Sequence, residues 1–202
     1  MKIDHLLVVS LGTIVGLTAC SSDQKEEVRK PNILILLADD AGYADFGFMG
    51  SADIQTPNID RLAAEGRIFT DAHVAATVSS PSRSMMLTGR YGQRYGYECN
   101  LDKPGDGIPD DEELLPALLK RYGYRTGCIG KWHLGSEPSQ RPNAKGFDTF
   151  YGLLAGHRSY FYDPETSDKD GNLQQYQYNG QKLSFDGYFT DELASKARQF
   201  VA

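Results

Sequence analysis

A continuous apolar run near the start of the chain limits its fold more than any other sequence feature. Residues 32–38 read NILILLA and carry no charged side chain. A strand with one face in water alternates polar and apolar residues, whereas an unbroken run of this length is typical of a strand covered on both faces. Such strands belong to parallel sheets flanked by helices. The run therefore predicts a strand at Asn32–Ala38 in a sheet of this kind.

Helix and strand signals alternate along the rest of the chain. Proline favours the first helical turn and glycine the position just after a helix, because proline lacks an N–H and glycine tolerates positive φ. The alternation predicts an α/β fold whose functional residues lie beyond the carboxyl ends of the strands. The predicted helices run from Pro57 to Gly66, from Pro81 to Gly89 and from Leu115 to Tyr122, and further strands are predicted at Ile68–Val74 and Arg125–Lys131.

Composition places these elements in one acidic globular domain. The chain has 202 residues, of which 40% are apolar, and a formal net charge of −6. Neutralising nucleic-acid phosphates needs a basic face, and the sequence has no long run of Lys and Arg. We therefore expect no nucleic-acid partner.

The chain begins with the pattern of a secretory signal. Leu6–Ala19 carries no charge, and it is too short to span a bilayer, which needs about 20 apolar residues. A basic start, a short apolar run and small residues before a cleavage site describe a signal peptide. The string ending at Cys20 (LTAC) resembles the lipobox of bacterial lipoproteins, which makes Cys20 the lipidated first residue. We predict a signal peptide at 1–19, a polar tether at 20–30, and a membrane-anchored lipoprotein in the periplasm or at the cell surface.

Polar residues follow two of the predicted strands. Asp39 and Asp40 come directly after the apolar run, and hard carboxylate oxygens suit Ca²⁺ or Mg²⁺, although an Asp pair before glycine also occurs as a solvated turn. Lys131 and His133 stand two residues apart at the end of the later strand and therefore share a face, with Trp132 on the opposite face. A cation and an imidazole on one face can stabilise developing charge and donate a proton. A solvent-exposed strand edge has the same pattern.

A serine-rich string opens the second predicted helix. In SSPSR, Ser79 lies where backbone N–H groups and the helix dipole favour an anion, and Arg83 can reach back one turn toward it. This arrangement suits a nucleophile that attacks a charged oxyanion. The alternative is an ordinary serine-rich helix cap.

Four strings together resemble the type I sulfatases of the alkaline phosphatase superfamily. They read PNILILLADDAGYADFG, TPNIDRLAAEG, SSPSRSMMLTGRY and GYRTGCIGKWHLG, followed by GFDTFYG, and they extend in order from Pro31 to about Gly152. The resemblance implies an alkaline-phosphatase-like mixed sheet flanked by helices. It also implies hydrolysis of sulfate esters, with sulfated carbohydrate as the expected substrate.

The resemblance further implies a modified nucleophile at Ser79. The first residue of the family's [CS]-x-P-S-R string becomes formylglycine, and serine at this position implies conversion by a radical-SAM maturase. Asp39, Asp40 and the modified Ser79 would hold Ca²⁺, or alternatively Mg²⁺. Arg83 would stabilise the aldehyde hydrate, while Lys131 and His133 would grip the sulfate.

The chain departs from the family pattern in length. Family members continue further and carry their remaining metal ligands in that later part. A final helix that begins near Thr190-Asp191-Glu192 reaches Ala202 while still apolar. We therefore expect residues 31–202 to be the N-terminal portion of a sulfatase catalytic domain, inactive alone.

The stretch between Tyr151 and the final helix mixes aromatic residues with turn signals, which predicts a hairpin at the rim of the site. His157 and Arg158 are candidate substrate-binding residues, with Tyr160 as a stacking face; a solvated loop is equally compatible. Cys99 and Cys128 are expected to be buried thiols without a bridge. Two other functions remain open: phosphodiester or phosphonate hydrolysis on the same superfamily fold, and an inactive remnant that binds sulfated glycans.

Overall fold

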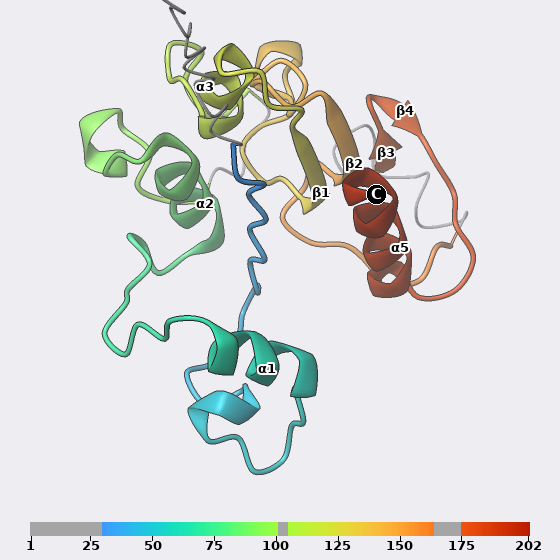
Figure 1. The fold of residues 1–202 in the computed structure, drawn as a ribbon. Coiled ribbons are helices and arrows are strands. Elements are labelled where there is room, and N and C mark those ends of the chain that lie inside the picture. The colour runs from blue at the N-terminus through green and yellow to red at the C-terminus, as the bar shows by residue number, and fades with distance from the viewer. Residues whose placement is uncertain (1–29, 101–104, 164–174) are drawn as a thin grey trace, which may run out of the picture. The chain divides into compact units, whose positions relative to one another are not determined.

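The computed structural model describes residues 30–100, 105–163 and 175–202 (Figure 1). The chain divides into two units, residues 1–38 and 39–202, which are described separately. The predicted signal peptide at 1–19 and the predicted lipidation site Cys20 lie outside the described residues. In the part of the chain that the structure describes, no helix is long and apolar enough to cross a membrane.

The apolar run does not form the predicted strand. Residues 32–38 are outside any helix or strand. A strand exists only through hydrogen bonds to a neighbour, and the described residues of this unit, 30–38, contain no second strand. The apolar run therefore indicates that these residues favour burial. Strand formation also needs a neighbouring strand, which the run does not specify.

The second unit contains a four-stranded mixed sheet in the order β1-β2-β3-β4. β1 (Gly127–Lys131) pairs with β2 (Thr149–Leu153) in parallel, and the remaining pairs are antiparallel. β3 (Tyr176–Tyr178) and β4 (Gln181–Lys182) form a hairpin, as predicted for this region. Its turn is at Asn179-Gly180, where both residues have positive φ. The turn signals at 164 and 170–172 lie outside the described residues.

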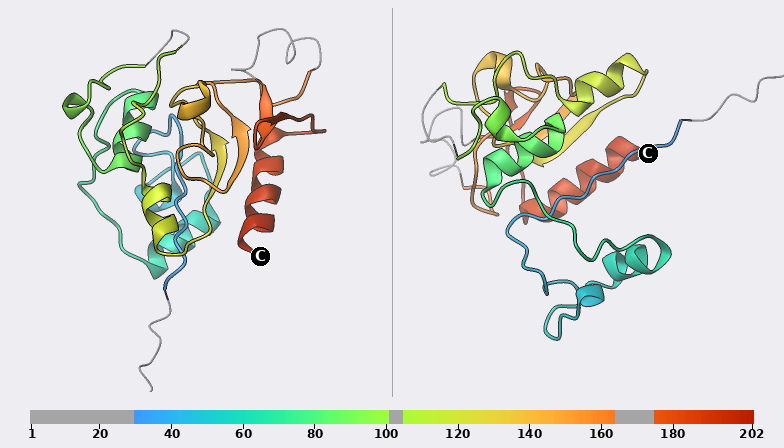
Figure 2. Two further views of the ribbon diagram at one scale, coloured as in Figure 1. Left: turned by 90° about the horizontal axis from the view of Figure 1, so that it is seen from above. Right: turned by 90° about the vertical axis from the view of Figure 1, so that its left-hand side faces the viewer.

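Helices form where proline and glycine predicted them. α1 (Pro57–Glu65) is followed by Gly66, and α3 (Leu115–Arg121) is followed by Tyr122 and Gly123. α5 (Phe189–Val201) forms near the predicted final cap and contacts β1 and β2, as Figure 2 shows. Short 3-10 turns occupy 47–49, 92–94 and 138–140.

The prediction of a second strand, at Ile68–Val74, is also wrong. Ile68–Val74 has no strand, and a turn at Thr70-Asp71 interrupts it. Ile68, Phe69 and Val74 are all exposed. An apolar run that contains a turn-forming Asp breaks the ladder before two strands can pair.

Two hydrophobic clusters support the sheet and its connections. The first packs Trp132 and Phe150 with Leu134 and Tyr97, and the second packs Tyr176 of β3 against Phe189 at the start of α5. Because Trp132 directly follows β1, the first cluster fixes the end of the strand that carries Lys131 and His133.

Candidate active site

Ser79 begins helix α2 (Ser79–Thr88), two residues earlier than the predicted start at Pro81. Proline is tolerated throughout the first turn because its missing N–H has no intrahelical partner there. The Arg83 Nε donates to Ser79 Oγ at 3.3 Å, as expected for residues four apart on a helix. The Ser79 hydroxyl is also 3.1 Å from His133 Nδ1. The structure therefore brings Ser79, Arg83 and His133 together.

Lys131 and Asp39 join the same cluster. Lys131 Nζ donates to Asp39 Oδ2 at 2.7 Å, and Arg83 Nη2 lies 3.3 Å from Asp39 Oδ1. Arg83 Nη1 also donates to the Lys131 carbonyl at 2.8 Å. Burial disfavours the charged form of Asp39, but the Lys131 hydrogen bond and the Arg83 charge outweigh it and lower the pKa of Asp39. The cluster thus holds a carboxylate between two cations.

The side chains after β1 diverge as predicted. Lys131 and His133 turn toward Asp39 and Ser79, while Trp132 is buried and its Nε1 donates to the Gln140 carbonyl at 3.0 Å. His133 has φ of 59°, a conformation that side-chain-bearing residues seldom adopt. Its N–H donates to the Leu154 carbonyl at 3.0 Å, so the backbone next to β2 holds it in place.

Three further residues frame His133, and sequence reasoning assigned none of them a role. A Cβ at Gly156 would stand 2.6 Å from the His133 ring, so only glycine leaves the ring its space. Ser80 Oγ donates to the His133 carbonyl at 2.6 Å and lies 2.8 Å from the Tyr97 hydroxyl. The position of Ser80 in the SSPSR string was a usable signal, whereas nothing marked Tyr97 or Gly156.

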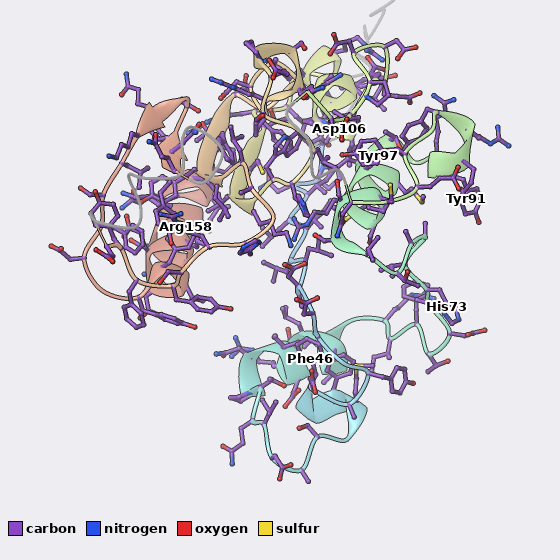
Figure 3. The ribbon with its side chains drawn as sticks, turned by 180° about the vertical axis from the view of Figure 1, so that it is seen from behind. Phe46, His73, Tyr91, Tyr97, Asp106 and Arg158 are labelled. Carbon is purple, nitrogen blue, oxygen red and sulfur yellow. The ribbon has the colours of Figure 1, made fainter. Side chains whose placement is uncertain are left out.

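The candidate substrate residues follow Gly156 directly. His157 is exposed, and Arg158, labelled in Figure 3, is partly buried. Beyond them, the exposed rings of Tyr160 and Phe161 each pack on Tyr188, with centroid distances of 5.3 and 5.6 Å. Along the chain from Gly156, which adjoins the His133 ring, polar residues thus come first and exposed aromatic residues follow.

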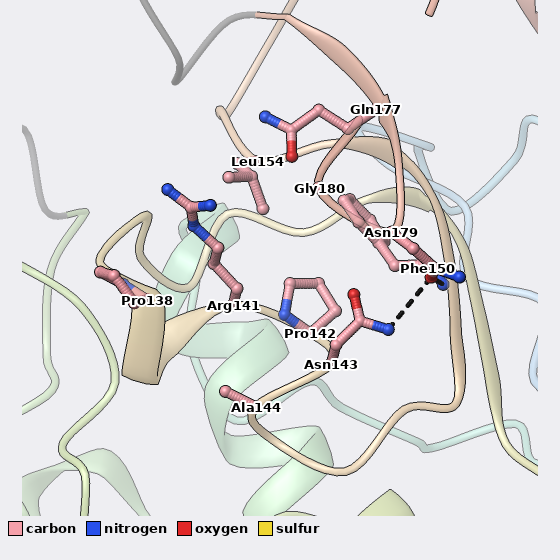
Figure 4. A pocket seen from close by; sticks show the side chains of 10 residues that line it. All are labelled: Pro138, Arg141, Pro142, Asn143, Ala144, Phe150, Leu154, Gln177, Asn179 and Gly180. Carbon is pink, nitrogen blue, oxygen red and sulfur yellow. Dashed lines mark hydrogen bonds between the residues drawn. The ribbon is translucent and has the colours of Figure 1, made fainter. Parts of the chain in front are cut away.

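A separate pocket lies at the hairpin side of the sheet (Figure 4). Its lining includes Arg141, Phe150 and Gln177, and Asn143 Nδ2 donates across it to Asn179 Oδ1 at 3.0 Å. None of the predicted site residues lines this pocket.

The predicted metal ligands supply only part of a coordination shell. Asp40 has φ of 58°, which breaks the strand-like alternation after residue 39. Among the described residues, no group of three or more His, Cys, Asp or Glu side chains could hold a metal ion. Ca²⁺ takes 6 to 8 oxygens, so two carboxylates and Ser79 do not by themselves fit the ion. Asp39, Asp40 and Ser79 therefore remain predicted metal ligands that supply only part of the coordination shell.

Both described cysteines are free. Cys128 is partly buried, which meets the expectation of burial only in part, and desolvation raises the pKa of its thiol to about 12. Cys99 is exposed, so the expectation of burial was wrong for that residue. It follows the loop after the second 3-10 turn, where no strand or helix covers it.

Comparison with known proteins assigns the family. The sulfatase family model matches residues 31–202, and the chain belongs to this family. It is 42% identical over 157 residues to the N-acetylgalactosamine-6-sulfatase of Sus scrofa, covering 73% of this chain and 29% of that protein. Family members generally use a formylglycine and a divalent cation.

Two solved structures resemble the fold closely. Ps i-CgsB in complex with k-i-k-neocarrahexaose has a TM-score of 0.79 and 41% identity, over 86% of this chain and 41% of that one. BT4656 in complex with its substrate D-glucosamine-2-N,6-O-disulfate has a TM-score of 0.70 and 32% identity, over 86% and 31%. These neighbours confirm the predicted α/β fold with its mixed sheet. The chain spans less than a third of the length of the curated relatives it matches.

Proposed function

We propose that this chain carries the nucleophile of a sulfuric ester hydrolase that acts on sulfated carbohydrate, with Ser79 converted to formylglycine. The observation that carries the proposal is the position of Ser79 Oγ, between Arg83 Nε at 3.3 Å and His133 Nδ1 at 3.1 Å. A related protein is named for a 6-sulfated amino sugar, and the structure of a neighbour is in complex with a disulfated glucosamine. Both support a sulfated sugar as the substrate class.

Each side chain of the cluster has a role in this proposal. A formylglycine hydrate at position 79 would supply one hydroxyl oxygen that bonds to sulfur while the S–O bond to the sugar breaks and the sugar oxygen takes up a proton. Deprotonation of its second hydroxyl would then restore the aldehyde and release sulfate. Arg83 holds the attacking oxygen and stabilises its negative charge, since a fixed guanidinium needs no reorganisation during the reaction. Lys131 offers a second cation to the sulfate oxygens. His133, in contact with the Ser79 oxygen, orients it and is placed to hold a proton.

Asp39 and Asp40 are the proposed protein ligands of the divalent cation, with Ca²⁺ favoured over Mg²⁺ because irregular oxygen coordination suits the larger ion. The Asp39 carboxylate is ionised and faces the Arg83 side chain, so it also keeps the guanidinium oriented toward Ser79. Oxygen ligands beyond the described residues are needed to complete the shell.

The surface after Gly156 is the proposed binding region for the sugar. His157 and Arg158 carry polar N–H donors, and the exposed rings of Tyr160, Phe161 and Tyr188 offer apolar faces. Arginine binds anionic groups through a planar fork and aromatic rings pack against ring-shaped ligands. Sugar units on either side of the reacting sulfate would lie along this surface.

We further propose that Cys20 is lipidated after removal of residues 1–19 and that the protein faces the periplasm or cell surface. The support is the LTAC string and the polar stretch after it. Labelling with a radioactive fatty acid, followed by detergent partitioning, tests this. The native protein should carry label and enter the detergent phase, whereas Cys20→Ser should carry none. Unlabelled, soluble native protein would reduce the segment to an ordinary secretion signal.

The modification of Ser79 is tested by peptide mass spectrometry. Protein made together with a radical-SAM maturase should lose two hydrogens at Ser79 and react there with a hydrazide probe, and protein made without the enzyme is the matched control. The modified full-length protein should hydrolyse an aryl sulfate, and Ser79→Ala should not. An unmodified Ser79 in a protein that cleaves phosphodiesters would instead favour the phosphodiesterase function.

A further inference from the structure

We propose that Ser80, next to the nucleophile, is a positioning residue that holds His133 in register with Ser79, and that Tyr97 orients the Ser80 hydroxyl for this purpose. The inference rests on the proposed function. Ser80 Oγ donates to the His133 carbonyl at 2.6 Å. A serine hydroxyl has one proton, so the Tyr97 hydroxyl, 2.8 Å away, must donate to Ser80 Oγ.

The two donors of the chain from Tyr97 to Ser80 to His133 are buried. Ser80 is 1% exposed and Tyr97 2% exposed, so neither can touch a substrate. The bond to the His133 carbonyl is partly buried, and water compensates poorly for a donor lost there, which makes the contact with Ser80 costly to remove. Burial also raises the pKa of Tyr97 to about 12, so the phenol keeps its proton at neutral pH.

The bond matters because of the backbone conformation of His133. Its φ of 59° lies in the left-handed region, where a side-chain-bearing residue stays only when its surroundings hold it. Two bonds do so here, one from its N–H to Leu154 and one to its carbonyl from Ser80. Release of the carbonyl allows the peptide to rotate, and the imidazole then turns away from Ser79.

Two adjacent serines thus dock the start of α2 onto one histidine. Ser79 contacts the ring of His133 and Ser80 contacts its carbonyl. The Ser80 N–H donates to Asn100 Oδ1 at 2.9 Å, which fixes the helical turn itself. The distance between the nucleophile and the imidazole is therefore set by a buried contact that is separate from the reacting atoms.

The chain supplies a matched control on the same helix. Ser84 is fully buried and its hydroxyl lies 2.7 Å from the Tyr95 hydroxyl, so it forms the same kind of serine–tyrosine pair one turn away. The Tyr95 hydroxyl also lies 3.2 Å from Thr88 Oγ1, at the end of the helix, and Ser84→Ala removes a partly buried hydrogen bond of the same kind. A purely structural role for Ser80 predicts the same consequences for both serines.

The test compares Ser80→Ala and Tyr97→Phe with Ser84→Ala and Tyr95→Phe. In the maturase-treated full-length protein, we expect kcat for an aryl sulfate to fall about ten- to a hundredfold in the first pair with little change in KM, the size expected for a misplaced catalytic group. The second pair should stay within twofold of the native protein. Tyr97→Phe keeps the ring and so remains informative if Ser80→Ala folds poorly.

A second readout does not depend on catalysis. The ¹⁵N chemical shifts of the His133 ring, measured in this chain, should change in Ser80→Ala and Tyr97→Phe and stay unchanged in the controls. Equal kcat values, or equal ring shifts, in the two pairs would overturn the proposal. If Ser79→Ala retains full activity, the proposed function fails, and the ring shifts still decide the role of Ser80.

Discussion

At the scale of single residues, Arg83 joins three parts of the site through three different nitrogen atoms. It contacts the Ser79 hydroxyl, the Lys131 carbonyl and the Asp39 carboxylate. A planar guanidinium can do this because its N–H groups point outward in a fixed fork, whereas an ammonium group is a single point on a flexible stem.

Arg83→Lys is therefore expected to be nearly as damaging as Arg83→Ala. Lysine keeps the charge and loses two of the three directions, and one preorganised electrostatic contact is commonly worth about 3 kcal/mol in the transition state. The kcat/KM for an aryl sulfate should fall about a hundredfold in the full-length protein. Arg67→Lys, on the exposed segment after α1, serves as the control. A loss below tenfold in Arg83→Lys would place Arg83 outside the reacting centre.

Residue spacing predicted which side chains lie together. Ser79 and Arg83 are four apart on a helix, which places them on one face. Lys131 and His133 reach the same cluster as their alternation with Trp132 predicted, but β1 ends at Lys131 and His133 has a positive φ, so strand periodicity alone does not place the imidazole. The contact of Ser80 with the His133 carbonyl was not predictable in this way. It depends on a positive φ at a histidine, and a positive φ at a non-glycine residue leaves no signature in the sequence.

At the scale of elements, the parallel pairing of β1 and β2 depends on a close approach of two glycines. Gly130 pairs with Gly152, and a Cβ at Gly152 would stand 1.8 Å from the Gly130 carbonyl oxygen. The obstacle is backbone, so no side chain can move aside.

Gly152→Ala should lower the free energy of unfolding by about 3 kcal/mol or more, because relief of the clash requires the two strands to separate. Gly42→Ala is the control, since its Cβ would meet only the flexible Asp45 carboxylate, at 3.2 Å. Chemical denaturation of both variants measures the difference. Equal stabilities would show that the strands shift apart at little cost.

Asp148 lies just before β2 and contacts Thr126, which lies just before β1. The contact depends on the ionised carboxylate and is therefore acid-sensitive. Its carboxylate pairs with Lys120 at 2.7 Å and accepts from the Thr126 N–H at 2.8 Å. The Lys120 hydrogen bond and then the Thr126 N–H lower the pKa of Asp148 below its ordinary value of 3.8.

A carboxyl with a lowered pKa stabilises the folded state above its unfolded pKa, and the contribution is lost as the pH falls through the folded value. The stability difference between the native protein and Asp148→Asn should therefore be full at neutral pH and shrink below about pH 4. Urea denaturation across this range measures it. A difference that does not vary with pH would mean that the charge of Asp148 contributes nothing.

Helix boundaries were predictable from the sequence because proline and glycine act locally. Two of the predicted strands, in contrast, were wrong. Pro57 and Gly89 mark helix ends within a residue or two of the observed bounds. The runs at 32–38 and 68–74 are apolar enough for strands and form none within the described residues. Strand formation depends on a distant partner, and a local pattern does not contain the partner.

At the scale of the whole molecule, divalent-cation binding should be weak in this 202-residue chain. Asp39 and Asp40 are the predicted carboxylate ligands, and Asp39 is already paired with Lys131 and Arg83. A ligand near its dissociation constant adds less than about 1 kcal/mol of stability, by RT ln(1 + [L]/Kd). Thermal melting with and without millimolar Ca²⁺ should give nearly equal midpoints, with Asp39→Asn as a comparison. A large shift that Asp39→Asn removes would reveal further ligands within the chain.

Trp132 gives the molecule a built-in optical probe. It is the sole tryptophan of the sequence, and it is buried with its ring edge-on to Phe147, between the residues that point to Asp39 and Ser79. Fluorescence excited at a wavelength that tryptophan absorbs and tyrosine does not is therefore emitted from Trp132 alone, on the side of the chain opposite Lys131 and His133. A red shift of that emission would signal that water has reached the support beneath Lys131 and His133, without any label having been attached.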